Sequence, residues 1–240
     1  MADPALLARD LSKLALLAVP LQIRIAYEAL SWGRHVNEFP QAWSIVQSAD
    51  RALGDDLGRL YVEKTFGPDA KARMAKMIDA LTAALRDDVE SLPWMTADTK
   101  KKALAKLAAF STVKVGYPRE WKDYSSVVVK RDDSLGNWLR ARVFEIKRDY
   151  ARIDEPTDRT LWGMTPPTVN AYYDASMNDM NFPAGVLLPP LFDLSIDEAP
   201  GYGNGGSTVG HELIHGFDDE GRRFDGRGNL REWWTPADAA

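Results

Sequence analysis

Apolar residues near the start of the chain recur at helical spacing. Successive members of this stripe lie 4, 3, 4, 3 and 4 residues apart, so they share one face of a helix. Pro20 lies inside the stripe and has no backbone N–H, so we expect a kink or a break there. The stripe consists of Leu7, Leu11, Leu14, Ala18, Leu21 and Ile25.

The following residues, up to about position 155, are rich in Ala, Leu, Lys, Arg and Glu, which favour helices. A helix over about residues 41–65 is expected to end before Gly67-Pro68, which punctuates the chain. The next helix continues to about residue 91, and a later one covers about residues 134–153. The first two thirds of the chain is therefore predicted to be helical.

One more helix is expected to begin after Thr96, a residue type that serves well as an N-cap. Asp98 lies in its first turn, where the helix dipole favours negative charge. The run Lys100–Lys102 follows, and a solvated helix face explains it better than a binding patch.

The pattern changes at residue 156, after which Gly, Pro, Asn and aromatic residues become common. Val169–Tyr173 and Met177–Phe182 have the character of short strands joined by a turn at Asp174–Ser176. We therefore expect a mainly α protein with a small β part, divided into residues 1–155 and residues 156–240.

Composition narrows the possible functions. The 240 residues carry 30 Lys and Arg against 35 Asp and Glu, so the net charge of −5 gives no electrostatic reason to expect a nucleic-acid partner. The chain has no Cys, which excludes disulfides, iron–sulfur clusters, cysteine-bound zinc and thiol catalysis.

The uncharged stretch Leu14–Gln22 is much shorter than the roughly 20 residues of a membrane span. Asp3 and Asp10 precede it, which is untypical of a signal peptide.

The candidate chemistry lies on a helix that is expected to start near Ser207, after a Gly-rich stretch. It carries the pattern His-Glu-x-x-His at His211, Glu212 and His215. Residues four apart lie on one helix face, so the two imidazoles can bind one metal ion. Zinc suits such a site, and Glu212 can act as the general base toward a water molecule on the metal. Apolar neighbours predict that this helix is largely buried: Val209, Leu213, Ile214 and Phe217.

Two histidines do not complete a catalytic zinc site, which normally has three protein ligands and a water molecule. A third histidine in the pattern His-Glu-x-x-His-x-x-Gly-x-x-His is excluded, because Asp218 and Gly221 occupy the Gly and His positions. Glu232 and His35 are further candidates with little support from their surroundings. The sequence thus predicts two zinc ligands and a base, with no convincing third ligand in this chain.

Several segments together resemble one enzyme family. Val209–Asp219 is similar to the zinc helix of the neprilysin-like zinc metallopeptidases, which include neprilysin, the endothelin-converting enzymes and bacterial oligopeptidase O. Other segments resemble motifs of that family in the same order, from about residue 50 to residue 238. These segments are Leu60–Lys64, Lys114–Pro118, Trp162–Pro166, Asn170–Tyr173, Phe182–Gly185, Pro189–Asp193 and Phe224–Thr235.

The resemblance implies a role for each matching residue of the zinc helix. His211 and His215 would bind a single zinc ion, and Glu212 would be the general base. Asp218 or Asp219 would orient a zinc histidine from outside the coordination sphere, as such histidines usually require.

The resemblance also implies a fold and a substrate. It predicts a helical lobe followed by the first part of a thermolysin-like catalytic domain. Asn170 and Ala171 would lie on an edge strand and hold the backbone of a peptide substrate, because an extended peptide can add to a sheet edge.

One departure from the family limits these expectations. The family's zinc glutamate belongs to an E-x-x-x-D motif some tens of residues after the zinc helix, and this chain stops at Ala240. The resemblance therefore implies a peptidase polypeptide that needs a complementary C-terminal portion, and little activity in the isolated chain. The alternative is a catalytically incomplete remnant, or a module that only binds peptide or metal. The family favours a periplasmic or secreted location.

Overall fold

The computed structural model describes residues 40–110 and 113–239. The expected helical stripe over residues 7–25 and the candidate ligand His35 lie outside the described residues. The described residues form two compact units. The first unit contains residues 40–64 and 119–158, and the second contains 65–118 and 159–239 except for residues 111–112. The expected division into residues 1–155 and 156–240 stays a prediction.

The first unit is built on the two helices that the pattern predicts there. Helix α3 (Pro40–Thr65) has a break in its backbone at Leu53, where φ is −139° and ψ is 46°. Helix α6 (Ser134–Tyr150) has Asp133 as its N-cap residue, and the Asp133 carboxylate accepts a hydrogen bond from the Gly136 N–H. It ends three residues before the expected end at residue 153.

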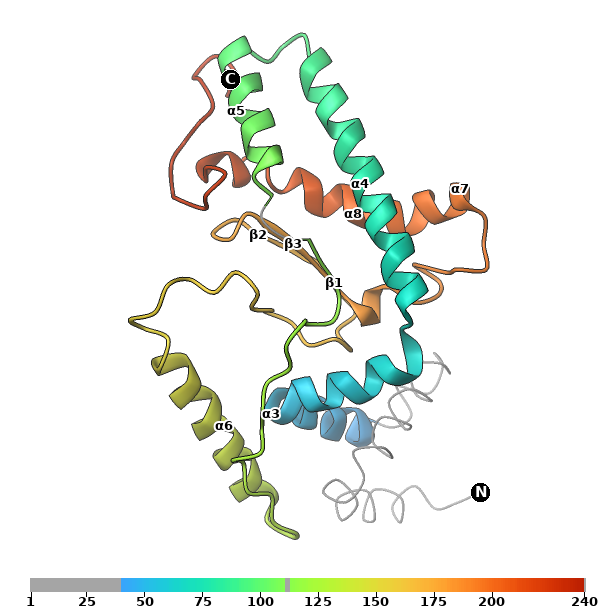
Figure 1. Ribbon diagram of the computed structural model, residues 1–240, viewed down its shortest axis with the longest axis vertical. Coiled ribbons are helices and arrows are strands. Elements are labelled where there is room, and N and C mark those ends of the chain that lie inside the picture. Colours follow the sequence, from blue (N-terminus) through green and yellow to red (C-terminus); the bar gives the residue numbers. More distant parts are fainter. Residues whose placement is uncertain (1–39, 111–112, 240) are drawn as a thin grey trace. The chain divides into compact units, whose positions relative to one another are not determined.

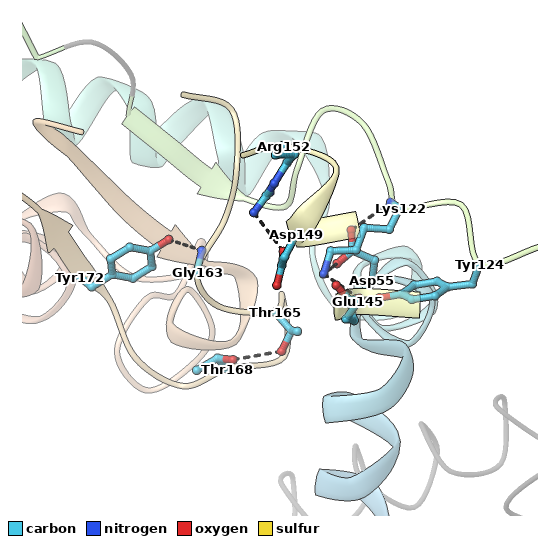
Figure 2. A network of polar contacts seen from close by, with 10 residues as sticks. All are labelled: Asp55, Lys122, Tyr124, Glu145, Asp149, Arg152, Gly163, Thr165, Thr168 and Tyr172. Atoms are coloured by element: carbon cyan, nitrogen blue, oxygen red, sulfur yellow. Dashed lines mark hydrogen bonds and ion pairs between the residues drawn. The ribbon is translucent and has the colours of Figure 1, made fainter. Parts of the chain in front are cut away.

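A polar cluster in the first unit joins the segment before α6 to both helices (Figure 2). The Lys122 ammonium lies 3.0 Å from the Glu145 carboxylate on α6, and the Tyr124 hydroxyl donates to the same carboxylate over 3.2 Å. The Lys122 N–H donates to the Asp55 carboxylate on α3. Burial, followed by the charge of Glu145, raises the pKa of Tyr124. The cluster is thus a half-buried brace between α3 and α6.

In the second unit, α4 (Pro68–Ser91) and α5 (Ala97–Ala108) follow the predicted pattern. As predicted, Thr96 is the N-cap residue and α5 begins directly after it, but the Thr96 side chain makes no cap hydrogen bond to α5. Instead, the Thr96 N–H and hydroxyl both donate to the Asp238 carboxylate, at 2.6 Å and 2.7 Å. The Thr99 hydroxyl donates to the same carboxylate. A carboxylate from 142 residues away therefore holds the start of α5.

A three-stranded sheet lies in the second unit, with the strand order β1-β3-β2. Strand β1 (Val113–Gly116) runs parallel to β3 (Asp179–Pro183), and β2 (Tyr172–Asp174) runs antiparallel to β3. The expectation that the first strand of the hairpin begins at Val169 is wrong, because β2 begins at Tyr172. The pattern also missed β1, which is four residues long and mostly buried, so polar and apolar positions do not alternate along it.

Three helical segments follow each other without a gap after a short 3₁₀ turn (η1, Ala184–Val186) and a loop. They are α7 (Glu198–Gly201), the π-helical segment η2 (Tyr202–Gly206) and α8 (Ser207–Ile214). The Gly-rich stretch before α8 is therefore helical itself. A last 3₁₀ turn, η3, spans Gly221–Arg223.

Helix α8 contacts α4 and strand β2, and α4 also contacts α5 and β1 (Figure 1). As predicted, Val209, Leu213 and Phe217 are buried. The expectation for Ile214 is wrong, because 49% of it is exposed. The apolar core of the second unit includes Met74, Met77, Ile78, Met180, Phe182, Val209 and Leu213.

The arrangement confirms a mainly α chain with a small sheet. Within the described ranges, no helix combines the length and the apolar character that crossing a membrane requires.

Candidate metal centre

The two predicted histidines meet at the end of α8. Their side chains lie one turn apart, and the Nε2 atoms of His211 and His215 are 3.1 Å from each other. The ring centroids are 4.5 Å apart and the ring planes are close to perpendicular. Two zinc–nitrogen bonds of about 2.0–2.1 Å at a tetrahedral angle would place their nitrogen atoms about 3.3 Å apart. The pair therefore fits two ligands of one zinc ion.

Asp218 lies against the outer nitrogen of His215. Its Oδ2 is 2.7 Å from His215 Nδ1, and its Oδ1 accepts the N–H groups of Gly221 and Glu220 at 2.7 Å and 3.1 Å. Burial raises the pKa of Asp218, but these hydrogen bonds outweigh it and hold the pKa below its usual value. An ionised carboxylate at Nδ1 favours the tautomer with the proton on Nδ1, which leaves the Nε2 lone pair free for a metal.

Of the two aspartates proposed as orienting partners, the structure thus brings Asp218 to a histidine, whereas Asp219 is exposed. Gly221 completes the turn that brings Asp218 there. A Cβ atom at Gly221 would collide with the carbonyl oxygen of His215. Only glycine lets the turn fold back this closely onto the end of α8.

Glu212 is 5% exposed and lies between the two histidines in sequence. Burial raises its pKa, while the charges of His211 and His215 and a hydrogen bond from the Tyr173 N–H act against that rise. A raised pKa makes a carboxylate a stronger base than it is in water. Its surroundings therefore suit the predicted role in proton transfer.

Lys106 of α5 contacts the turn Gly221–Phe224, which follows α8. The sequence pattern did not single out this residue. Its ammonium donates to the carbonyl oxygens of Gly221 and Phe224, at 2.7 Å and 2.8 Å. Burial lowers the pKa of Lys106 to about 8, and the charges of Asp218 and Asp225 act against that shift. A sequence signal did exist, because Lys106 continues the buried stripe of Thr99 and Ala103 along one face of α5.

The residues proposed for substrate binding lie immediately before β2, not on it. Asn170 is exposed and Ala171 is buried. Strand β2 is the sheet edge that contacts α8, so both residues lie next to the strand that approaches the zinc helix. Their role stays a prediction.

No third ligand joins the two histidines within residues 40–110 and 113–239, where no cluster of three or more His, Asp or Glu side chains could hold a metal ion. The Glu232 carboxylate accepts the Trp234 N–H at 3.2 Å and lies 3.8 Å from Arg222. Among the described residues, the candidate site therefore consists of two imidazoles and an adjacent carboxylate.

Sequence models of one family match both parts of the chain. The N-terminal model of Peptidase family M13 matches residues 15–118, and the second model of the family matches residues 170–240. An endothelin-converting enzyme homolog of Locusta migratoria is 36% identical over 197 residues, which are 79% of this chain and 27% of that protein. A neutral endopeptidase of Lactobacillus helveticus is 34% identical over 218 residues, 88% of this chain and 34% of that protein.

Solved structures agree with these relatives. The zinc metalloprotease ZMP1 of Mycobacterium tuberculosis superposes with a TM-score of 0.77 at 46% identity, over 82% of this chain and 30% of that one. PEPO from Lactobacillus rhamnosis superposes with a TM-score of 0.70 at 36% identity, over 84% of this chain and 32% of that one. The chain thus spans about a quarter to a third of the length of these proteins.

The two family models, the relatives and the solved structures all point to one assignment. They confirm the resemblance to the neprilysin-like metallopeptidases and the expected fold, a helical lobe followed by the first part of a thermolysin-like catalytic domain. This chain is a member of peptidase family M13, the neprilysin-like family.

Proposed function

We propose that this chain provides the histidine ligands and the general base of a zinc metallopeptidase that hydrolyses peptide bonds. The observation that carries the proposal is the meeting of the His211 and His215 Nε2 atoms at 3.1 Å, beside the buried Glu212. Two candidate metal ligands and a candidate base thus lie within five residues of one another at the end of α8.

His211 and His215 would hold zinc through their Nε2 atoms. A bound zinc ion supplies Lewis acidity toward a peptide carbonyl and lowers the pKa of water. Glu212 takes a proton from the attacking water molecule and passes it to the leaving amine. Asp218 keeps the His215 ring in the orientation and tautomer that face the metal.

A peptide is the proposed substrate. Strand β2 is an edge strand of the sheet, where an extended chain can add, and Asn170 and Ala171 lie immediately before it. The names of the relatives, an endopeptidase and an endothelin-converting enzyme homolog, support this class of substrate.

The third zinc ligand is proposed to come from a complementary C-terminal polypeptide that carries the E-x-x-x-D motif of the family. Two imidazoles in an open site hold zinc loosely, because a catalytic zinc normally has three protein ligands. We therefore expect the chain by itself to bind zinc weakly and to hydrolyse peptides poorly.

The test combines zinc analysis with peptide hydrolysis, with and without the complementary polypeptide. Glu212→Gln removes the base, so we expect it to lower the rate of hydrolysis by about 10²–10⁴-fold while zinc stays bound. Glu220→Gln, at an exposed glutamate in the same region, is the matched control and should leave the rate unchanged.

Full activity in Glu212→Gln would contradict the assignment of the base. Zinc binding without any hydrolysis, even when the complementary polypeptide is present, would support a module that only binds metal or peptide.

A further inference from the structure

The ammonium group of Lys106 is a buried charge of the second unit that the proposed chemistry does not use. The residue is 2% exposed, and its ammonium contacts backbone carbonyl oxygens of the turn that follows the zinc helix. Taking an ammonium out of water is costly unless its protons find acceptors. The two carbonyl oxygens of the turn supply such acceptors, which explains why the buried ammonium lies next to them.

A continuous series of hydrogen bonds leads from Lys106 to the histidines. Lys106 Nζ donates to the Gly221 carbonyl at 2.7 Å, and the Gly221 N–H donates to Asp218 Oδ1 at 2.7 Å. Asp218 Oδ2 then lies 2.7 Å from His215 Nδ1, and His215 Nε2 lies 3.1 Å from His211 Nε2. Both sides of one peptide segment, the carbonyl and the amide of Gly221, are thus used in the series.

The Lys106 side chain is itself held in place. Its ammonium lies 5.7 Å from the ring centroids of both Tyr173 and Trp233 and 5.9 Å from that of Phe217, distances at which an aromatic face attracts a cation. The Asn178 side chain donates to the Lys106 carbonyl at 3.2 Å and accepts from the Tyr173 hydroxyl at 2.8 Å. A fixed donor of this kind can fix the turn that it contacts.

We propose that Lys106 is a positioning residue of the zinc site, which anchors the Gly221–Phe224 turn and thereby holds Asp218 against His215. The inference rests on the proposed function, because it holds that the hydrogen bonds from Lys106 to His215 support metal binding. Lys106 contacts neither metal ligand and takes no part in proton transfer.

The sign of the effect separates this role from simple electrostatics. A cation near a metal site repels the metal, so its removal alone would strengthen zinc binding. Loss of the anchor would instead free Asp218 and weaken binding, since outer partners of zinc histidines contribute about 10- to 100-fold in affinity.

The experiment titrates Zn²⁺ into the full chain and follows the His215 ring nitrogens by NMR in the metal-free protein. Lys106→Met keeps the length of the stem and removes the ammonium. We expect it to weaken zinc binding by about 10-fold, the lower end of that range, and to reduce the population of the Nδ1–H tautomer. Lys106→Arg, which keeps charge and donors, should restore part of both signals and gives a second folded variant.

Two comparisons make the test specific. Lys71→Met removes the same charge from α4, where the ammonium lies 4.3 Å from the Tyr117 ring centroid, and should change neither signal. In an Asp218→Asn background, Lys106→Met should have little further effect on zinc binding, because the two residues act in series.

Unchanged or tighter zinc binding in Lys106→Met, with an unchanged His215 tautomer, would overturn the role of Lys106 alone. If the wild-type chain itself bound no zinc, the proposed function would fail and this inference with it.

Discussion

The second unit buries two lysine ammonium groups, and they are compensated in different ways. Lys114 of β1 forms an ion pair with Asp179 of β3, and both side chains are almost completely buried. Lys106 of α5 donates instead to two carbonyl oxygens of a turn, with aromatic rings around it. One lysine is paired with a full opposite charge, and the other with backbone dipoles.

The difference shows what each buried cation can hold in place. The Lys114 pair joins neighbouring strands, and the Asn181 side chain donates to the second oxygen of Asp179 at 2.7 Å. That ion pair therefore links strands β1 and β3 of the sheet. Lys106 bonds instead to the backbone of a turn, and the Gly221 N–H in that turn donates to the Asp218 carboxylate, which lies next to His215. A charge held by peptide groups is thus suited to positioning a site.

The largest loss of stability is expected when the buried ion pair of Lys114 and Asp179 is disrupted. Asp179→Asn leaves Lys114 buried without an opposite charge, so it should lower the free energy of unfolding by about 3–5 kcal/mol. Urea denaturation measures this change. The double variant Lys114→Met/Asp179→Leu removes both charges and should recover much of the stability. A single variant as stable as the wild type would mean that the pair contributes little.

The next test asks whether hydrogen bonds alone can hold a buried carboxylate. Burial raises the pKa of Asp238, but hydrogen bonds from Thr235, Thr99 and Thr96 outweigh it and hold the pKa well below its usual value. The folded state thus binds fewer protons at this group than the unfolded state. Its stabilisation is complete above about pH 4 and is lost as the pH falls through the lowered folded pKa.

Asp238→Asn should therefore be less stable than the wild type at pH 7, and the gap should narrow as the pH falls below 4. Denaturation at several pH values measures the gap. Asp154→Asn, at an exposed aspartate, is the control and should show no such narrowing. A difference in the free energy of unfolding that is the same at every pH would contradict a stabilising role for the ionised Asp238 carboxylate.

The smallest effect is expected where an ion pair has no burial. Lys102 and Asp98 form an i, i+4 pair on α5, and their side chains are 46% and 63% exposed. Exposed helix pairs contribute about 0.3–0.5 kcal/mol, so Asp98→Ala should change the free energy of unfolding by no more than about that amount. If Asp98→Ala lowered the free energy of unfolding by more than about 1 kcal/mol, solvent exposure would not explain the difference between this pair and the buried lysines.

Sequence alone predicted the parts that depend on local spacing. The helical positions of His211 and His215 follow from a separation of four residues, which fixes a shared helix face whatever surrounds it. Helices α3, α4 and α6 follow from helix-favouring composition and from the Gly67-Pro68 break, which are also local features of the sequence. The roles of Glu212, Asp218 and Asn170 at a working site stay predictions.

Features that depend on distant partners could not be read from the pattern. Strand β1 exists because Val113–Gly116 pairs with Met180–Pro183, far along the chain. Thr96 looked like a cap by itself, but the acceptor is Asp238. Lys106 is the same residue type as the exposed Lys101 and Lys102, and although its position on the stripe of Thr99 and Ala103 indicates burial, its contact with the Gly221 turn lies 115 residues away in sequence.

The span of the Lys106–Gly221 contact has a consequence for the order of folding. The β2–β3 hairpin closes over a short turn, whereas Lys106 and Gly221 are 115 residues apart and must close a long loop before they meet. Loop closure costs more conformational entropy as the loop lengthens, so nonlocal contacts form slowly. We therefore expect the hairpin to be among the first parts of the second unit to form, and the Gly221–Phe224 turn that contacts Lys106 to be among the last.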